Sequence, residues 1–403
     1  MLSVKKNEYK ERGIILKNNR NASRTITTLH GKVTYSRNIL VPVDMESKKK
    51  LLETENVKSI APLDQVLGIA KLPFKMSVDL MLRCAYWAQN QSSYQDAEEA
   101  LFEASKISVN DDTIRLVTNC IGKSVFEEDC RKVDEVFAAY SSGSLSFGKA
   151  KKGVLYIEAD GAALNTRHKD DNGSTWRENK LGVVFSSDNI HYWKDKNGKR
   201  QHQILKREYI SYIGSAEVFK KHLYACAYRN GYGTYRETVL LSDGAAWIAN
   251  MAEELFPDAQ RILDIFHLKE NVYSYAKCKF GLDEKKYVPW AEDISEKLEN
   301  GEWEKVLSTV SSEEKYPNCV NLYHYIYENR NSMDYPKYKE QGYFIGSGAI
   351  ESGNKVVLQT RLKQAGMRWE PETAQYVLSL KAKRKSGLWE KDVVKYIRSY
   401  YSK

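Results

Sequence analysis

The stretch VLYIEADGAAL, residues 154–164, decides how this chain folds. Its apolar, β-branched run predicts a buried strand, and the Asp160-Gly161 pair predicts that the strand ends in a carboxylate before a sharp turn. The same arrangement recurs around Asp243 in VLLSDGAAWI, residues 239–248. Because ligands of open α/β sheets bind beyond the carboxyl ends of the strands, the two aspartates predict an α/β domain with a site at that edge.

A third acid, Glu351, lies in GSGAIESGN, residues 346–354, just after a Gly-Ser-Gly helix start. We expect it on a long helix that ends near Gly366. Mg²⁺ prefers oxygen ligands and keeps several waters, so a few carboxylates together with phosphate oxygens can hold it. Asp160, Asp243 and Glu351 are therefore predicted to bind two divalent ions such as Mg²⁺ that act on a phosphodiester.

Each acid also has a purely structural explanation. Asp-Gly is a common turn pair, and Glu351 with Lys355 has the spacing of a helical ion pair. Glu158 competes with Asp160, because strand alternation points both side chains to the same face. We favour Asp160 since it lies nearer the predicted strand end. The joint occurrence of three acids in this order favours a shared metal site over three unrelated turns.

A further acid–histidine motif, Asp264 and His267, lies in RILDIFHLKEN, residues 261–271. We expect Asp264 to close the last strand of the core and His267 to open a helical region. An aspartate that orients the imidazole would suit phosphate positioning or indirect support of the metal site. The alternative is a structural histidine that only donates a hydrogen bond.

The bulk composition indicates a globular protein of more than one domain. The chain has 403 residues, of which 42% are apolar, and 62 Lys and Arg against 53 Asp and Glu give a net charge of +9. Such a basic excess is compatible with a nucleic-acid partner. The six cysteines form no CxxC pair, so we expect reduced thiols in a cytoplasmic protein. No apolar run reaches the roughly 18 residues that a membrane span needs.

Changes of pattern along the chain predict six segments. In order they are a polar region with a β-hairpin around His30-Gly31 (1–60), a helical region (61–132), a Ser/Gly-rich linker (133–152), the first part of a mixed-sheet core (153–267), an all-α insertion (268–342), and the core completion with basic C-terminal helices (343–403). Three strands in succession, followed by alternating helices and strands, is the order of a ribonuclease-H-like catalytic core.

Within the helical region, residues 93–122 predict a helix, a tight turn and a second helix. The pattern resembles a helix-turn-helix, whose second helix would enter the major groove of DNA. A plain helical hairpin is the alternative. Arg115, Asn119 and Lys123, together with Thr118, are expected to face outward as DNA contacts.

A second set of basic residues follows Glu351. Lys355, Arg361, Lys363 and Arg368 are expected to contact the DNA backbone, while the apolar residues between them pack inward. No cysteine–histidine zinc cluster is present in the sequence. DNA recognition would therefore rest on these basic surfaces and on the proposed helix-turn-helix.

The motifs ADG, SDGAAWI, DIFH and GSGAIES, followed by RLKQAGMRW, together resemble bacterial insertion-sequence transposases of the ISLre-two family. These are DDE enzymes related to the Mutator-like group, and the resemblance spans roughly residues 90–385. It implies a ribonuclease-H-like core interrupted by a helical insertion, Mg²⁺ or Mn²⁺ dependence, and Asp160, Asp243 and Glu351 as catalytic acids. Asp264 and His267 match a Cys/Asp-x-x-His motif of related enzymes.

The resemblance also implies a reaction and partners. We expect hydrolytic nicking of double-stranded DNA at the terminal inverted repeats, followed by strand transfer to target DNA by a 3′-hydroxyl. Synapsis of two ends implies a homo-oligomer, a dimer or larger, associated with the nucleoid when bound to DNA. Two alternatives stay open, namely a nuclease of the same fold that does not join strands and a domesticated, non-catalytic DNA-binding protein.

Overall fold

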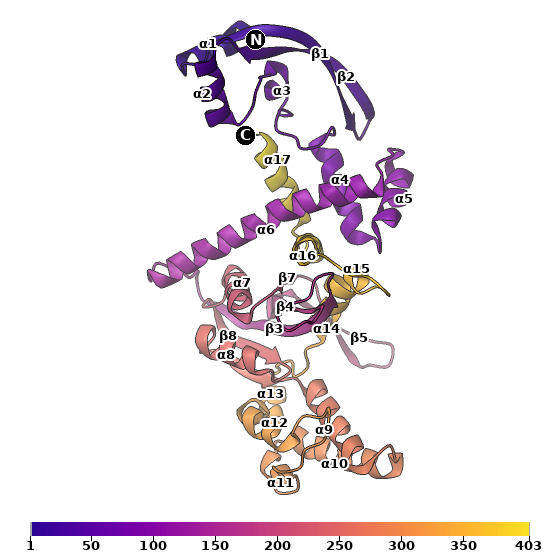
Figure 1. Cartoon of the computed structure of the whole chain (residues 1–403). Helices are drawn as coiled ribbons and strands as arrows, with labels where there is room; N and C mark the ends of the chain where they lie inside the picture. Colours follow the sequence, from indigo (N-terminus) through magenta and orange to yellow (C-terminus); the bar gives the residue numbers. More distant parts are fainter. Residues whose placement is uncertain (1, 403) are drawn as a thin grey trace. The chain divides into compact units, whose positions relative to one another are not determined.

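The structure is a computed structural model that describes residues 2–402 (Figure 1). The chain forms two compact units. Unit 1 runs to Val125 and also takes the C-terminal residues from Leu388 onward, and unit 2 is Phe126–Gly387. The C-terminal segment that we expected to complete the core is therefore divided, because its last helices pack within unit 1.

Unit 1 contains the expected β-hairpin. Strands β1 (Leu16–Thr28) and β2 (Gly31–Pro42) pair antiparallel around a two-residue turn, and Gly31 has a φ of +106°. The helices of this unit are α1 (Leu2–Glu11), α2 (Met45–Glu55), α3 (Pro62–Val66), α4 (Val78–Asn90), α5 (Tyr94–Ser105), α6 (Asp111–Ser141, shared with unit 2), η4 (Trp389–Val394) and α17 (Lys395–Ser402).

Helices α5 and α6 form the predicted helix–turn–helix segment of the backbone. The side chain of Asn110 caps α6 by accepting a hydrogen bond from the Thr113 amide at 3.1 Å. Helix α6 continues to Ser141, so the first half of the predicted linker is helical. The connection to the next strand is only residues 142–150, because the apolar face of α6 extends further than its sequence pattern suggested.

Unit 2 is built on a mixed five-stranded sheet with the order β7-β4-β3-β8-β9. Its strands are β3 (Lys151–Asn165), β4 (Trp176–Ser186), β7 (Glu208–Ile213), β8 (Tyr235–Ser242) and β9 (Gln260–Leu263). Strand β4 runs antiparallel to β3 and β7, whereas β3, β8 and β9 are parallel. A separate hairpin, β5 (Ile190–Lys194) and β6 (Arg200–Ile204), leaves the sheet between β4 and β7. The expected α/β class with a mixed sheet is confirmed.

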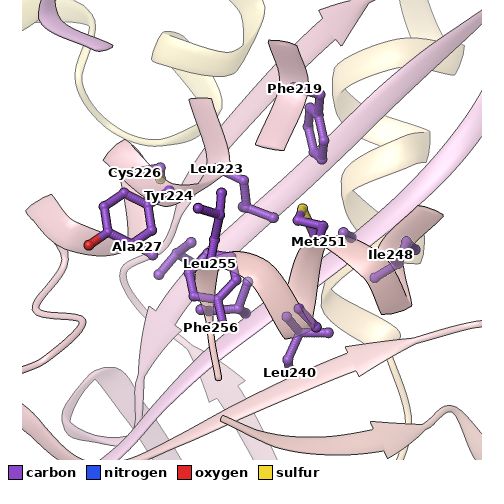
Figure 2. Close-up of a cluster of buried hydrophobic side chains, with 14 of the residues drawn as sticks. Phe219, Leu223, Tyr224, Cys226, Ala227, Leu240, Ile248, Met251, Leu255 and Phe256 are labelled. Carbon is purple, nitrogen blue, oxygen red and sulfur yellow. The ribbon is translucent and has the colours of Figure 1, made fainter. Parts of the chain in front are cut away.

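Strand alternation gives the two faces of the sheet different roles. Leu155, Ile157 and Ala159 of β3 point into an apolar cluster with α7 (Ala216–Arg229) and α8 (Ala246–Leu255), which Figure 2 shows in close-up. Each large side chain buried there contributes roughly 1.5–3 kcal/mol. The opposite face of β3 carries the acidic residues and meets the helices that follow in the chain.

The chain between the last strand and Glu351 is helical. The helices are α9 (Ile265–Phe280), α10 (Glu284–Glu299), α11 (Trp303–Leu307), α12 (Leu322–Asn329), η2 (Arg330–Ser332) and α13 (Tyr335–Glu340). Figure 1 shows them gathered at one end of unit 2. No strand interrupts residues 265–342, all of which the structure describes.

The helix predicted after Glu351 is continuous but not uniform. It comprises α14 (Gly348–Gly353), the π-helical segment η3 (Asn354–Gln359) and the short α15 (Thr360–Leu362). Helix α16 (Pro371–Lys385) then covers the edge strand β7, where the Ile213 amide donates to Gln375 Oε1 at 2.8 Å. This side chain satisfies the backbone of a strand that would otherwise be open at the sheet edge.

The expectations about cysteines and about membrane-spanning segments can also be compared with the structure. Cys278 and Cys319 are joined as a disulfide, with their Cα atoms 7.3 Å apart, so these two are not the reduced thiols that we expected. They lie 41 residues apart, and only the folding of the helical segment brings them together. Within residues 2–402, no helix has the length and apolarity needed to cross a membrane.

Candidate functional site

Three neighbouring parallel strands place aspartates at the same end of the sheet. Glu158 pairs with Leu241, and Ser242 pairs with Leu263, so Asp160, Asp243 and Asp264 follow at matching levels on β3, β8 and β9. The Asp264 amide also donates to the Ser242 carbonyl at 2.8 Å. The register of the sheet therefore gathers three acids that are far apart in the sequence.

Asp160 does not lie at the end of its strand, contrary to our prediction. The parallel ladder with β8 stops at Glu158, but the antiparallel ladder with β4 continues as far as Asn165, so the backbone stays extended through Gly161. Asp160 Oδ1 accepts from the Gly161 amide at 2.7 Å. Burial raises the pKa of Asp160, and the nearby charge of Asp243 raises it further.

Asp243 combines a turn with the site. Its Oδ1 accepts from the Ala245 amide at 2.9 Å, and Gly244 adopts a φ of +88°. A β-carbon at Gly244 would lie 2.9 Å from Leu263 and 3.0 Å from Tyr325, so only glycine fits this turn. The Tyr325 hydroxyl donates to the Asp243 carbonyl at 2.8 Å, which ties helix α12 to the turn.

Asp264 is fully buried and caps helix α9. Its Oδ1 accepts from the amide of Phe266 at 2.6 Å, and its Oδ2 accepts from the amide of Ser347 at 2.8 Å and from the Ser347 hydroxyl. The helix starts at Ile265, so Asp264 does not close the strand and His267 already lies in the first turn of α9. Asp264 thus fixes the start of α9 and the approach to α14 at one point.

Glu351 and His267 meet at this point. One ligand atom from each of Asp264, His267 and Glu351 lies within 4.8 Å of the others. The imidazole Nδ1 of His267 is 3.8 Å from Asp264 Oδ2, and it is buried with no hydrogen-bond partner among the described residues. Burial raises the pKa of Glu351, and the carboxylate of Asp264 adds to that rise.

Glu158 supports the helix that carries Glu351. Its buried carboxyl accepts from the Ile350 amide at 2.7 Å, which joins β3 to the first turn of α14. Burial raises the pKa of Glu158 to about 8, and the charges of Asp264 and Glu351 act in the same direction. We therefore read Glu158 as a support for the site, with Asp160 as the more accessible of the two carboxyls.

The donor set fits a divalent cation. Burial raises the pKa of Asp160 and of Glu351, neighbouring carboxylates raise both further, and a cation between these groups would relieve the repulsion. Two buried atoms, His267 Nδ1 and Asn354 Oδ1, have no hydrogen-bond partner among residues 2–402. Carboxylate oxygens suit Mg²⁺, and the added imidazole is also compatible with Mn²⁺. Asp160 lies outside this trio but interacts through charge with His267 and Glu351, and Asp243 interacts through charge with Asp160.

Comparison with known proteins gives a family. A protein family matches the chain from residue 4 to residue 396, which is nearly its whole length. The chain belongs to the uncharacterised protein family UPF0236. No curated protein matches this UPF0236 member.

Our prediction that Arg361 of this UPF0236 chain contacts DNA is wrong. Arg361 is 1% exposed, and its guanidinium carbon lies 5.0 Å from the centre of the Trp369 ring. The π-helical segment η3 shifts the faces of the residues that follow it, so Arg361 turns inward. Lys355, Lys363 and Arg368 are exposed, as a phosphate contact requires.

The residues of α6 that we predicted to contact DNA differ in their exposure. Arg115 and Lys123 are exposed, and Arg115 forms an ion pair with Asp112 at 3.0 Å. Thr118, expected to face outward, is buried and donates to the Ile114 carbonyl. Asn119 is only half-buried, but its Oδ1 is enclosed. Only Arg115 and Lys123 are therefore presented as we predicted.

Sequence reasoning missed two supporting residues and one surface. Asn354, which donates to Asp160 Oδ2 at 2.5 Å, lies three residues after Glu351, and this helical spacing could have revealed it. Ser347 gave no comparable indication, because its partner Asp264 is 83 residues away. The β5–β6 hairpin was signalled by the Asn197-Gly198 pair between alternating residues.

Proposed function

We propose that this protein is a DDE transposase of an insertion sequence. It cleaves DNA strands at the ends of the element and transfers the freed 3′-hydroxyl to target DNA. The observation that carries the proposal is the convergence of Asp160, Asp243, Asp264, His267 and Glu351 at one edge of the sheet. Asp160 lies on β3, Asp243 and Asp264 directly follow β8 and β9, and His267 and Glu351 lie on helices α9 and α14. This arrangement suits contact with a phosphodiester from several sides.

Two broader features support the same proposal. The order β7-β4-β3-β8-β9, with only β4 antiparallel to its neighbours β3 and β7, is the arrangement expected of a ribonuclease-H-like core. The helices between Asp264 and Glu351 occupy the place of the expected α-helical insertion. The UPF0236 family is associated with transposase-like proteins, which agrees with this reading.

The chain's own residues divide the work. Asp160, Asp243 and Glu351, with His267 beside them, would hold two divalent ions. When bound, these ions would supply Lewis-acid activation of the attacking oxygen and stabilise the leaving oxygen. Asn354 fixes the orientation of Asp160, while Asp264 and Ser347 fix the start of the helix that carries Glu351.

The reaction proceeds in two steps, strand cleavage and strand transfer. In the first, a water oxygen forms a bond to phosphorus at the element end, and the bond from phosphorus to the 3′-oxygen breaks, so that this oxygen leaves as a 3′-hydroxyl after taking a proton. In the second, the oxygen of that 3′-hydroxyl loses its proton and forms a bond to a phosphorus of target DNA, and the bond from this phosphorus to its own 3′-oxygen breaks, so that the displaced oxygen takes a proton and leaves as a new 3′-hydroxyl. The exposed Lys355, Lys363 and Arg368 are placed to hold the phosphates on either side.

The proposal is tested with DNA that carries the element ends and either Mg²⁺ or Mn²⁺. We expect nicking and joined products from the wild type, and neither product from Asp160→Asn, Asp243→Asn or Glu351→Gln. Glu340→Gln, on the exposed face of α13, is the matched control and should keep both activities. Nicking without joined products would favour the nuclease alternative. DNA binding without any cleavage by the wild type would favour a non-catalytic DNA-binding protein.

A further inference from the structure

A hollow of about 550 Å³ opens beside the carboxylate cluster in unit 2. Glu158 lines it, and the segment around Gly348 and Ala349, just before Glu351, forms part of its wall. The side chain of Phe266, between Asp264 and His267 in the sequence, forms part of another wall. The hollow and the acidic site therefore share the same elements, although none of the four residues proposed to hold the ions lines the hollow.

Aromatic rings dominate the lining. The ring centres of His202 and Phe344 are 4.7 Å apart and the two rings are stacked, with an angle of 29° between their planes. The ring centre of Phe344 in turn lies 6.3 Å from that of Phe185. Phe266 is 57% exposed, and its ring rests against Gly346, where a β-carbon would clash with it.

The β5–β6 hairpin leads into this hollow and is strongly basic. Residues 190–204 contain four Lys or Arg side chains against one Asp, namely Lys194, Lys196, Lys199, Arg200 and Asp195. Tyr192 and Trp193, just before Lys194, are also exposed, and the guanidinium carbon of Arg200 lies 4.1 Å from the centre of the Tyr192 ring. Figure 1 shows the hairpin projecting from the sheet. Its four basic side chains are exposed.

We propose that this hollow receives a single unpaired nucleobase of a DNA strand, stacked against Phe266 and His202, while the β5–β6 hairpin holds the adjoining backbone. The inference rests on the proposed function, which brings a DNA strand to the neighbouring carboxylates. Nucleobases stack on aromatic side chains whatever their sequence, and a positively charged ribbon follows the phosphates. The volume falls in the roughly 300–1,000 Å³ range of pockets that hold small ligands.

The polar groups of the hollow suit the edge of a base. Gln203 and Arg207 line it, and the Arg207 guanidinium also donates to the Ile204 carbonyl at 3.1 Å, which holds it at the foot of the hairpin. Their amide and guanidinium groups offer donors, and the amide oxygen an acceptor, to the Watson–Crick edge. A planar ring with a polar edge is therefore better matched to this lining than a purely apolar ligand.

The test measures binding in the absence of divalent ions, so that no strand is cut. The probes are a matched DNA duplex and the same duplex with one unpaired 2-aminopurine. We expect the wild type to bind the second duplex about tenfold more tightly, which corresponds to one stacked base, and to quench its fluorescence. His202→Ala and Phe266→Ala should each remove most of this preference and leave binding to the matched duplex unchanged.

Two further variants sharpen the result. His202→Phe keeps a ring that can stack and should restore the preference lost in His202→Ala. Phe147→Ala removes another exposed ring of unit 2, outside the hollow, and should behave as the wild type. Equal affinity of the wild type for both duplexes, absence of quenching, or an equal loss of both affinities in the His202 and Phe266 variants would overturn the inference.

Failure of this inference can be told apart from failure of the proposed function. If the wild type cleaves end-containing DNA but shows no preference for the unpaired base, only the nucleobase pocket is refuted. If the preference and its loss in His202→Ala are observed but no cleavage occurs with Mg²⁺ or Mn²⁺, the pocket stands and the transposase proposal fails.

Discussion

The side-chain amide of Asn354 donates a hydrogen bond to Asp160 Oδ2 at 2.5 Å and so joins the π-helical segment η3 to the central strand β3. Asn354 is buried, and its Oδ1 has no hydrogen-bond partner among the described residues. A side chain held in this way orients a carboxylate rather than filling space. π-Helical segments often occur at functional sites, because the extra residue in the turn redirects side chains.

Asn354→Ala should weaken metal-dependent cleavage by about 10–100-fold, the usual effect of removing a partner that orients a metal ligand. The reason is that Asp160 would lose its fixed orientation while the fold keeps its other contacts. The measurement is the initial nicking rate as a function of Mn²⁺ concentration. Gln359→Ala, an exposed amide at the end of the same segment, is the control and should keep the wild-type rate. Equal rates for both variants would contradict the role given to Asn354.

Glu351→Gln should abolish stabilisation of the protein by Mn²⁺. A ligand that binds only the folded state raises stability by RT ln(1 + [L]/Kd), about 2.7 kcal/mol at a hundredfold excess over Kd. We therefore expect the wild-type melting temperature to rise with Mn²⁺ and that of Glu351→Gln to stay constant. The measurement is thermal unfolding with and without the ion. A full Mn²⁺ response in the variant would remove Glu351 from the metal centre, whatever the enzyme's activity.

Asp264→Asn should lower the free energy of unfolding by roughly 1–3 kcal/mol. Both carboxylate oxygens of Asp264 accept hydrogen bonds in a fully buried setting, and an amide nitrogen in place of either oxygen would face a donor. Ser347→Ala, which removes one hydroxyl but keeps the backbone amide, should cost less. Urea unfolding of the two variants checks the order. A larger loss in Ser347→Ala would show that the hydroxyl, and not the carboxylate, organises this junction.

Gly244→Ala should destabilise unit 2 more than Gly342→Ala does. Both glycines have a positive φ, +88° and +74°, so both substitutions introduce backbone strain of about 1 kcal/mol or more. At Gly342 nothing lies within 4 Å of the new β-carbon, whereas at Gly244 it would meet Leu263 at 2.9 Å. In chemical denaturation, the loss of unfolding free energy in Gly342→Ala should therefore report the backbone strain alone, and the extra loss in Gly244→Ala should report the packing clash. Equal losses would mean that the turn after Asp243 relaxes without cost.

His222 should make the protein less stable as the pH falls. Burial lowers the pKa of His222 to about 4, while Asp129 opposes that shift. The unfolded chain, with the ordinary histidine pKa near 6.5, therefore binds a proton first, and stability is lost as the pH falls from about 6.5 to about 4. We expect a contribution on the order of 1–2 kcal/mol, reduced from the full shift because the ring is partly exposed.

His222→Phe is the variant that isolates this effect. The imidazole stacks on Tyr212 and Phe126, with ring centres 5.4 Å and 6.5 Å away, and a phenyl ring preserves that packing. The difference in unfolding free energy between variant and wild type should grow in favour of the variant between pH 7 and pH 5. A difference that does not change with pH would show that His222 is protonated alike in both states.

Local pattern was enough to predict much of the fold. Apolar, β-branched runs predicted the strands β3 and β8. Both aspartates that follow these runs lie where the parallel strands β3 and β8 stop pairing. Glu351 lies on the predicted helix. These features depend on neighbours within a few residues, so the sequence alone carries them.

Contacts between distant segments decided the rest. Pairing with β4 keeps β3 extended beyond Asp160, and the π-helical turn directs Arg361 toward Trp369 instead of toward solvent. The hydrogen bond between Asp264 and Ser347, 83 residues later, brings α14 close to α9. The resulting group of possible metal ligands includes Asp264, which we had predicted only to support the metal site indirectly. No local pattern encodes such a meeting.

The sequence by itself determined which residues can carry the chemistry, namely aspartates after apolar strand sequences, a helical glutamate and a histidine near an aspartate. The tertiary structure decided which of them converge, which are exposed and what holds each in place. The physical reason is that side-chain type and spacing are local properties, whereas burial, sheet register and hydrogen-bond partners depend on segments joined only when the chain folds. Asp160 illustrates both kinds of property, since the sequence places it after β-branched residues and the fold brings Asn354 to a position where it orients the carboxylate.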